Sequence, residues 1–124
     1  EGCRVFSTNF SITKLESYIQ NIDFDLNQFQ KDFLFFSNRY VTEGETNQRF
    51  DNLNFRKSDR KQFVSDVLCS KLTNQKEVIL ALTIIVYRLR NNFFHGTKNI
   101  QTIDQQNENF ISANSFLTTL LNYL

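Results

Sequence analysis

The chain contains no proline, tryptophan or methionine, and its 124 residues include only three glycines, two cysteines and one histidine. Methionine is missing even at the first position, where the sequence begins Glu-Gly-Cys, so we expect these residues to be a fragment of a longer chain. Without tryptophan and methionine, most of the large apolar volume comes from the 14 phenylalanines. The core is therefore predicted to be rich in phenylalanine.

Candidate cysteine and histidine ligands for a metal are also few, and neither sign of charge predominates. Cys3 and Cys69, with a single histidine, cannot complete a four-ligand zinc site, so we expect two reduced thiols, with Cys69 buried on a helix, and no metal or other cofactor. Lys and Arg number 14 and Asp and Glu number 13. The net charge thus gives no indication of nucleic-acid binding, which depends on local clusters.

Long hydrophobic runs are missing as well. The apolar stretch from Val78 to Leu89 is too short and too interrupted to span a bilayer, and nothing in the sequence resembles a signal peptide. We therefore expect a cytoplasmic, soluble protein with no membrane partner.

Helical periodicity dominates what is present. Ser11 is expected to cap a short helix, and a longer helix is predicted from Asp25 to an end at Gly44. The segment from Glu43 to Lys57 is expected to be a loop with one helical piece. The apolar positions of the longer helix recur at steps of three and four: Leu26, Phe29, Phe33, Phe36 and Tyr40.

Three further helices are predicted in the second half. Ser58 is the expected N-cap of the first, and Asn74 starts the central helix, which Gly96 ends. A polar loop rich in Gln and Asn then leads to a last helix. Its inward-facing residues are expected to be Phe110, Ile111, Phe116, Leu117, Leu120, Leu121 and Leu124. With no strand expected, the pattern predicts one all-α domain over residues 1–124, an up-and-down bundle of four to five helices.

Polar chemistry is densest at the predicted end of the central helix, in the stretch RLRNNFFHGTK. At about 100° per residue, Asn91 and His95 share a face, whereas Arg90 and His95 diverge by about 140°. Bringing these two side chains together requires the length of the Arg side chain, a distorted last turn near Gly96, or a second copy of the domain. The alternative interpretation is that His95, Arg90 and Lys98 only interact with the helix dipole and solvent.

Arg90, the polar Asn91 and His95 resemble the motif of the ribonuclease members of the HEPN superfamily, which are small all-α domains. The string VYRLRNNFFHGTK is similar to the form found in bacterial HEPN proteins of phage defence and abortive infection. It departs from that form at Gly96-Thr97, where two glycines are common.

The resemblance implies a metal-independent endoribonuclease of the toxin or anti-phage type, in which the ribose 2′-OH attacks the adjacent phosphate. The residue types suit this chemistry. His95 can transfer a proton near neutral pH, Arg90 can stabilise charge on the phosphoryl oxygens, and Asn91 can orient the imidazole or bind the phosphate. Arg88 and Lys98 are predicted to contact the RNA backbone.

One histidine cannot act as base and acid at the same instant. In the HEPN ribonucleases that this chain resembles, two motifs meet at a two-fold interface. The resemblance therefore implies a homodimer through the motif helix. The basic stretch RFDNLNFRKSDRK, with Arg56 and Lys57, is a second candidate RNA surface, for which the alternative is a solvated face. An antitoxin or a nucleotidyltransferase is the further partner that the resemblance suggests.

Two other functions remain open. One is a non-catalytic HEPN module that binds nucleotides or mediates assembly, and the other is a structural helical bundle in which the match is accidental. The presence of Arg90, Asn91 and His95 together favours the enzyme, because a binding module has no evident need for all three.

Overall fold

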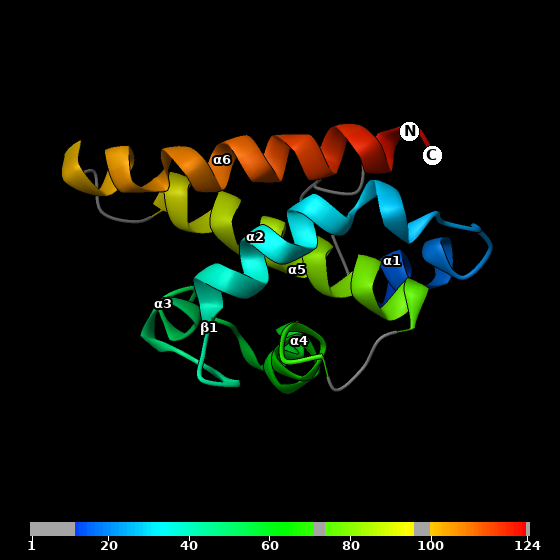
Figure 1. Cartoon of the computed structure of the whole chain (residues 1–124), viewed down its shortest axis with the longest axis horizontal. Helices are drawn as coiled ribbons and strands as arrows, with labels where there is room; N and C mark the ends of the chain where they lie inside the picture. The colour runs from blue at the N-terminus through cyan, green and yellow to red at the C-terminus, as the bar shows by residue number, and fades with distance from the viewer. Residues whose placement is uncertain (1–11, 71–73, 96–99, 124) are drawn as a thin grey trace.

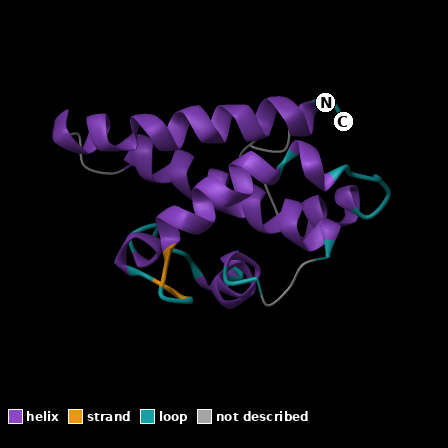
Figure 2. Cartoon of the chain, in the orientation of Figure 1, coloured by secondary structure: helices purple, strands orange, loops and turns teal. Residues whose placement is uncertain are grey.

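The computed structural model describes residues 12–70, 74–95 and 100–123. This part of the chain is mostly helical, as predicted (Figures 1 and 2). Its elements, in chain order, are α1 (Ile12–Ile19), the 3-10 turn η2 (Leu26–Gln28), α2 (Gln30–Tyr40), β1 (Val41–Thr42), β2 (Glu45–Thr46), α3 (Gln48–Asp51), the 3-10 turn η3 (Lys57–Asp59), α4 (Lys61–Leu68), α5 (Gln75–His95) and α6 (Ile100–Leu121). None of the described helices is both long enough and apolar enough to cross a membrane.

Helix α5 lies at the centre of the arrangement. It contacts α1, α4 and α6, while α2 contacts both α4 and α6. In Figure 1, α6 lies across the view and α4 is seen along its axis, so the helices do not all share one direction.

The central position of α5 follows from its sequence. Every side chain from Val78 to Val86 is buried, so this part of the helix is covered all round, which is typical of an interior helix. The hydroxyl of Thr83 donates to the carbonyl of Ile79 at 2.8 Å, so its burial leaves no donor unpaired. The prediction of a central helix over this β-branched stretch is confirmed.

Phenylalanine fills much of the core, as predicted. The ring of Phe29 is fully buried and lies 6.0 Å from that of Phe24, 5.5 Å from that of Phe116 and 6.0 Å from that of Tyr123, measured between centroids. This cluster joins the start of α2 to the end of α6. Tyr40, at the other end of α2, is also buried, and burial raises its pKa to about 12.

A buried carboxyl group also links α2 with α6. The hydroxyl of Ser115 donates to the carboxylate of Asp32 at 3.3 Å, and the Asp32 side chain is almost completely covered. Burial raises the pKa of Asp32 above its ordinary value, because the charged form loses its hydration.

The prediction of a helix from Asp25 to Gly44, without strands, is wrong at both ends. Asp25 caps η2, and α2 begins only at Gln30. Helix α2 ends at Tyr40, where the hairpin β1–β2 begins. Glu43 and Gly44 form its two-residue turn with φ of 55° and 81°, the positive values that such a turn requires.

Ser58 is not the N-cap of α4, because it lies inside η3. The carboxylate of Asp59 accepts a hydrogen bond from the backbone N–H of Arg56 at 2.8 Å, which closes this turn. Arg60 then adopts a left-handed conformation with φ of 56°, and α4 starts after it.

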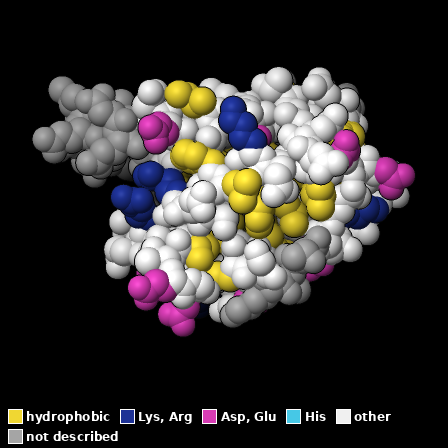
Figure 3. Space-filling view, in the orientation of Figure 1, with side chains coloured by type: hydrophobic (Ala, Val, Ile, Leu, Met, Phe, Trp, Pro, Cys, Tyr) yellow, Lys and Arg dark blue, Asp and Glu magenta, His cyan; other side chains and the backbone are white. Residues whose placement is uncertain are grey.

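The last helix is longer than predicted and its inward face is different. The Gln- and Asn-rich segment expected to be a loop belongs to α6, which begins at Ile100. Ile111 and Leu121, predicted to face inward, are 61% and 45% exposed, whereas Phe116 and Leu120 are buried as expected. Figure 3 shows hydrophobic side chains in the middle of one face of the molecule, with charged side chains of both signs around them.

Candidate functional site

The motif residues lie at the C-terminal end of α5. Arg90 is exposed, Asn91 is partly exposed, and His95 is the last residue of the helix. Helix α5 is continuous through position 95, so positions 90 and 95 diverge by about 140° around it, as expected from the sequence. Gly96, predicted to end the helix, and Lys98, a predicted RNA contact, lie outside the described residues.

Arg88 occupies a different environment from the one expected. Its side chain is buried, with 3% of its surface exposed. Its Nε donates to the carbonyl of Leu53 at 3.1 Å, and its Nη1 lies 3.5 Å from Oδ2 of Asp59. Position 88 is about 200° from position 90 around the helix, so the two arginines face opposite ways. The prediction that Arg88 contacts RNA does not fit this burial.

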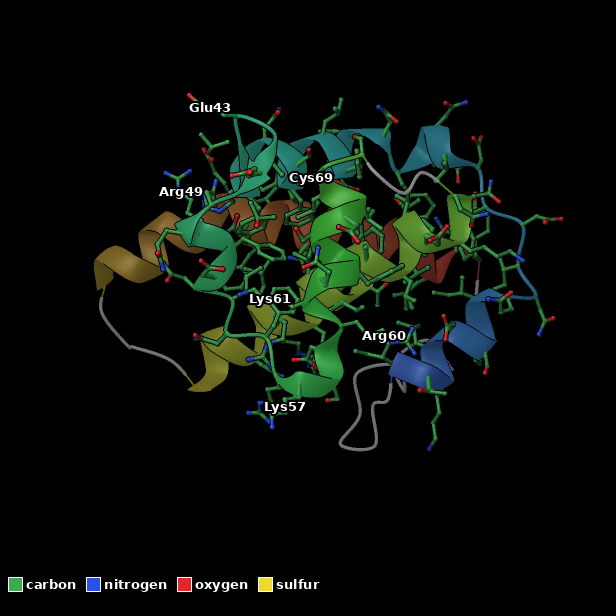
Figure 4. All side chains as sticks on the ribbon, turned by 90° about the horizontal axis from the view of Figure 1, so that it is seen from below. Glu43, Arg49, Lys57, Arg60, Lys61 and Cys69 are labelled. Atoms are coloured by element: carbon green, nitrogen blue, oxygen red, sulfur yellow. The ribbon has the colours of Figure 1, made fainter. Side chains whose placement is uncertain are left out.

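The basic stretch of residues 49–61 lies on the surface, but its cations are not equivalent (Figure 4). Arg60 forms an ion pair with Glu16 at 3.1 Å, and Lys61 forms one with Asp51 at 2.9 Å. Arg49, Arg56 and Lys57 are exposed, and no carboxylate of the described residues pairs with any of these three side chains. Arg56 and Lys57 are adjacent in the chain, so they are the pair of cations in this stretch that can bind one phosphate together.

Asp59 lies within this basic stretch, and the sequence alone assigned it no role. Its carboxylate is buried between the segment before α4 and Arg88 of α5. The signal in the sequence was a lone acidic residue amid four closely spaced cations, Arg56, Lys57, Arg60 and Lys61. An exposed carboxylate at this position would neutralise part of the positive charge of the neighbouring cations.

Within the described residues, no three His, Cys, Asp or Glu side chains lie close enough together to hold a metal ion. Cys69 has a free thiol at the end of α4 and is only partly buried, less than predicted. Cys3 lies outside the described residues.

A polar cleft of about 610 Å³ lies away from the motif, near the start of α5. Its lining includes Glu16, Gln20, Arg60 and Lys76. Three of these charged groups already have partners, because Arg60 pairs with Glu16 and the Lys76 ammonium donates to the Gln20 carbonyl.

Compared with protein-family models, with curated proteins and with solved structures, the chain gives no significant match. Its function must therefore be inferred from the motif at the end of α5 and from the surface around it.

Proposed function

We propose that this chain is a metal-independent endoribonuclease of the HEPN type, with Arg90, Asn91 and His95 as its catalytic residues. The observation that carries the proposal is the position of the complete motif at the end of a central helix whose earlier part is buried. Arg90 is exposed and Asn91 partly exposed there, so a ligand can reach both. A HEPN-type bundle is part of the same proposal, and the mostly helical fold is compatible with it.

The proposed reaction is a transesterification followed by product release. The imidazole of His95 takes the proton of the ribose 2′-OH, whose oxygen attacks the adjacent phosphorus. The bond from phosphorus to the 5′ oxygen breaks, a second proton donor protonates that oxygen, and a 2′,3′-cyclic phosphate remains. Arg90 stabilises the negative charge that develops on the phosphoryl oxygens. Asn91, one turn before His95, orients the imidazole or binds the phosphate.

The chemistry predicts the ends of the products. Cleavage is expected to persist in EDTA and to leave 5′-hydroxyl ends with cyclic or 2′/3′-phosphates, because no step uses a metal-bound water. Labelling the fragments with polynucleotide kinase, with and without prior phosphatase treatment, identifies both kinds of end. Strict dependence on magnesium, or fragments with 5′-phosphates, would contradict the mechanism.

The need for two proton-transfer groups favours a symmetric homodimer joined near the end of α5. In a two-fold arrangement each motif faces its copy, and one cleft holds two imidazoles and two guanidiniums. A bound phosphodiester relieves the repulsion among these cationic groups, so RNA is expected to strengthen the dimer. Sedimentation at micromolar concentration, with and without a 2′-O-methyl oligonucleotide, measures this. A strict monomer that still cleaves RNA would rule out the composite cleft.

The setting that we propose, a cytoplasmic toxin or anti-phage enzyme held in check by an antitoxin, follows from the resemblance of the motif alone.

A further inference from the structure

A buried ion pair connects the motif helix to the basic stretch. Arg88 of α5 and Asp59 of η3 are 3% and 5% exposed, with Nη1 of Arg88 3.5 Å from Oδ2 of Asp59. The same guanidinium donates from Nε to the carbonyl of Leu53 at 3.1 Å. One side chain of α5 thus holds both ends of the segment formed by residues 53–59.

The backbone of this segment adopts a conformation that needs such support. Asn54, inside the segment, and Arg60, directly after it, have φ of 58° and 56°, in the left-handed region that residues other than glycine seldom occupy. Asp59 also accepts the N–H of Arg56 at 2.8 Å, and the ring of Phe55 packs 4.9 Å from that of Phe50. Such backbone conformations persist where surrounding contacts hold them, and Arg88 supplies two of these contacts.

The burial of Asp59 also decides the charge of the surface. Arg56, Lys57 and Ser58 are exposed between the buried ends of the segment. The neighbouring carboxylate faces Arg88 in the interior, so it does not neutralise Arg56 and Lys57 at the surface. We call these two exposed cations the basic platform.

The buried ion pair connects the basic platform to α5, the helix that carries the motif. Arg88 precedes His95 by seven positions, which is two helical turns or about 10 Å along the axis, and seven positions return to the same side of a helix. Figure 4 shows the side chain of Lys57 pointing away from the body of the molecule. The platform is thus held by the same helix that carries Arg90, Asn91 and His95.

We infer that Arg88 and Asp59 are positioning residues that hold Arg56 and Lys57 as a phosphate-binding platform for the RNA strand entering the proposed cleavage site. The inference rests on the proposed function. It assigns Arg88 an indirect role in RNA binding, in place of the direct contact expected from the sequence.

The platform is tested by binding rather than by cleavage. The probe is a fluorescent 2′-O-methyl oligonucleotide of mixed sequence, which lacks the attacking hydroxyl, and anisotropy is measured over a range of salt concentrations. Replacing both Arg56 and Lys57 by Ala is expected to weaken binding about tenfold or more and to lower the salt slope by about 1.4, or about 0.7 for each phosphate that is no longer neutralised. The control, Lys14→Ala with Lys31→Ala, removes two exposed charges from α1 and α2 and should bind nearly as wild type. Equal weakening in both double variants would overturn the platform.

The positioning role is tested by variants that leave the net charge unchanged. Arg88→Lys keeps the charge but cannot hold Leu53 and Asp59 together as a guanidinium does. The double variant Arg88→Met with Asp59→Asn removes one charge of each sign and leaves no uncompensated buried ion, so it is expected to fold. Both are expected to weaken binding several-fold and to raise KM for cleavage more than they lower kcat. Wild-type affinity and salt slope in either folded variant would overturn the positioning role.

These results separate the inference from the proposed function. A chain that binds the oligonucleotide through the platform but never cleaves RNA would overturn the enzyme and keep the platform as a binding surface. A chain that cleaves RNA with Arg56 and Lys57 both replaced and binds as wild type would keep the enzyme and overturn the platform.

Discussion

Replacing His95 by alanine is expected to lower the rate of RNA cleavage by about 10²- to 10⁴-fold, the usual contribution of a general acid or base. Arg90→Ala is expected to cost about 10²- to 10³-fold, because it removes stabilisation of the phosphoryl oxygens in the transition state. Single-turnover rates with an end-labelled RNA measure both effects without interference from product release.

Stability provides the control for these variants. Arg90 is exposed and His95 ends its helix, so each substitution is expected to change the free energy of unfolding by no more than about 1 kcal/mol. Helix content and Tm from circular dichroism measure this change. If either variant lost its cooperative melting transition, its loss of activity would come from unfolding, and the prediction that this side chain contributes little to stability would be wrong.

Replacing Phe29 by alanine is expected to have the largest effect on folding. The ring is fully buried against Phe24, Phe116 and Tyr123, and its removal leaves a cavity where α2 meets α6. Such substitutions cost about 3–5 kcal/mol, which should lower the Tm of a domain of this size by about 10 °C or more. Thermal and urea unfolding followed by circular dichroism measure the loss.

Leu34→Ala is the matched control for Phe29→Ala. Leu34 lies on α2, the helix that Phe29 directly precedes, but it is 47% exposed, so its loss removes little buried surface and should cost well under half as much. Similar destabilisation by the two substitutions would contradict the packing between α2 and α6.

The predictions that succeeded were those that depend on regular helical spacing. The apolar stretch from Val78 to Leu89 predicts a buried central helix, since apolar residues occupy most sides of it, and α5 is that helix. The register then places Arg90, Asn91 and His95 on its last turns. Long periodic segments carry this information within themselves, without reference to the rest of the fold.

The predictions that failed depend on short or distant interactions. The hairpin turn requires positive φ values at both Glu43 and Gly44. Only the glycine indicates such a turn in the sequence, because glutamate seldom adopts a positive φ. Ser58 is a good capping residue, but Asp59 closes the local turn first and α4 starts later. In the sequence, Arg88 looks like a surface cation. Its burial depends on Leu53 and Asp59, which lie far from it along the chain.

The central claim is that this chain cleaves RNA through the motif at the end of α5 without a metal ion. The most direct measurement incubates the purified chain with mixed RNA in EDTA, beside a His95→Ala protein purified in parallel. The account predicts fragments with the wild-type chain and intact RNA with the variant. Equal cleavage by both proteins, or intact RNA with both, would contradict it.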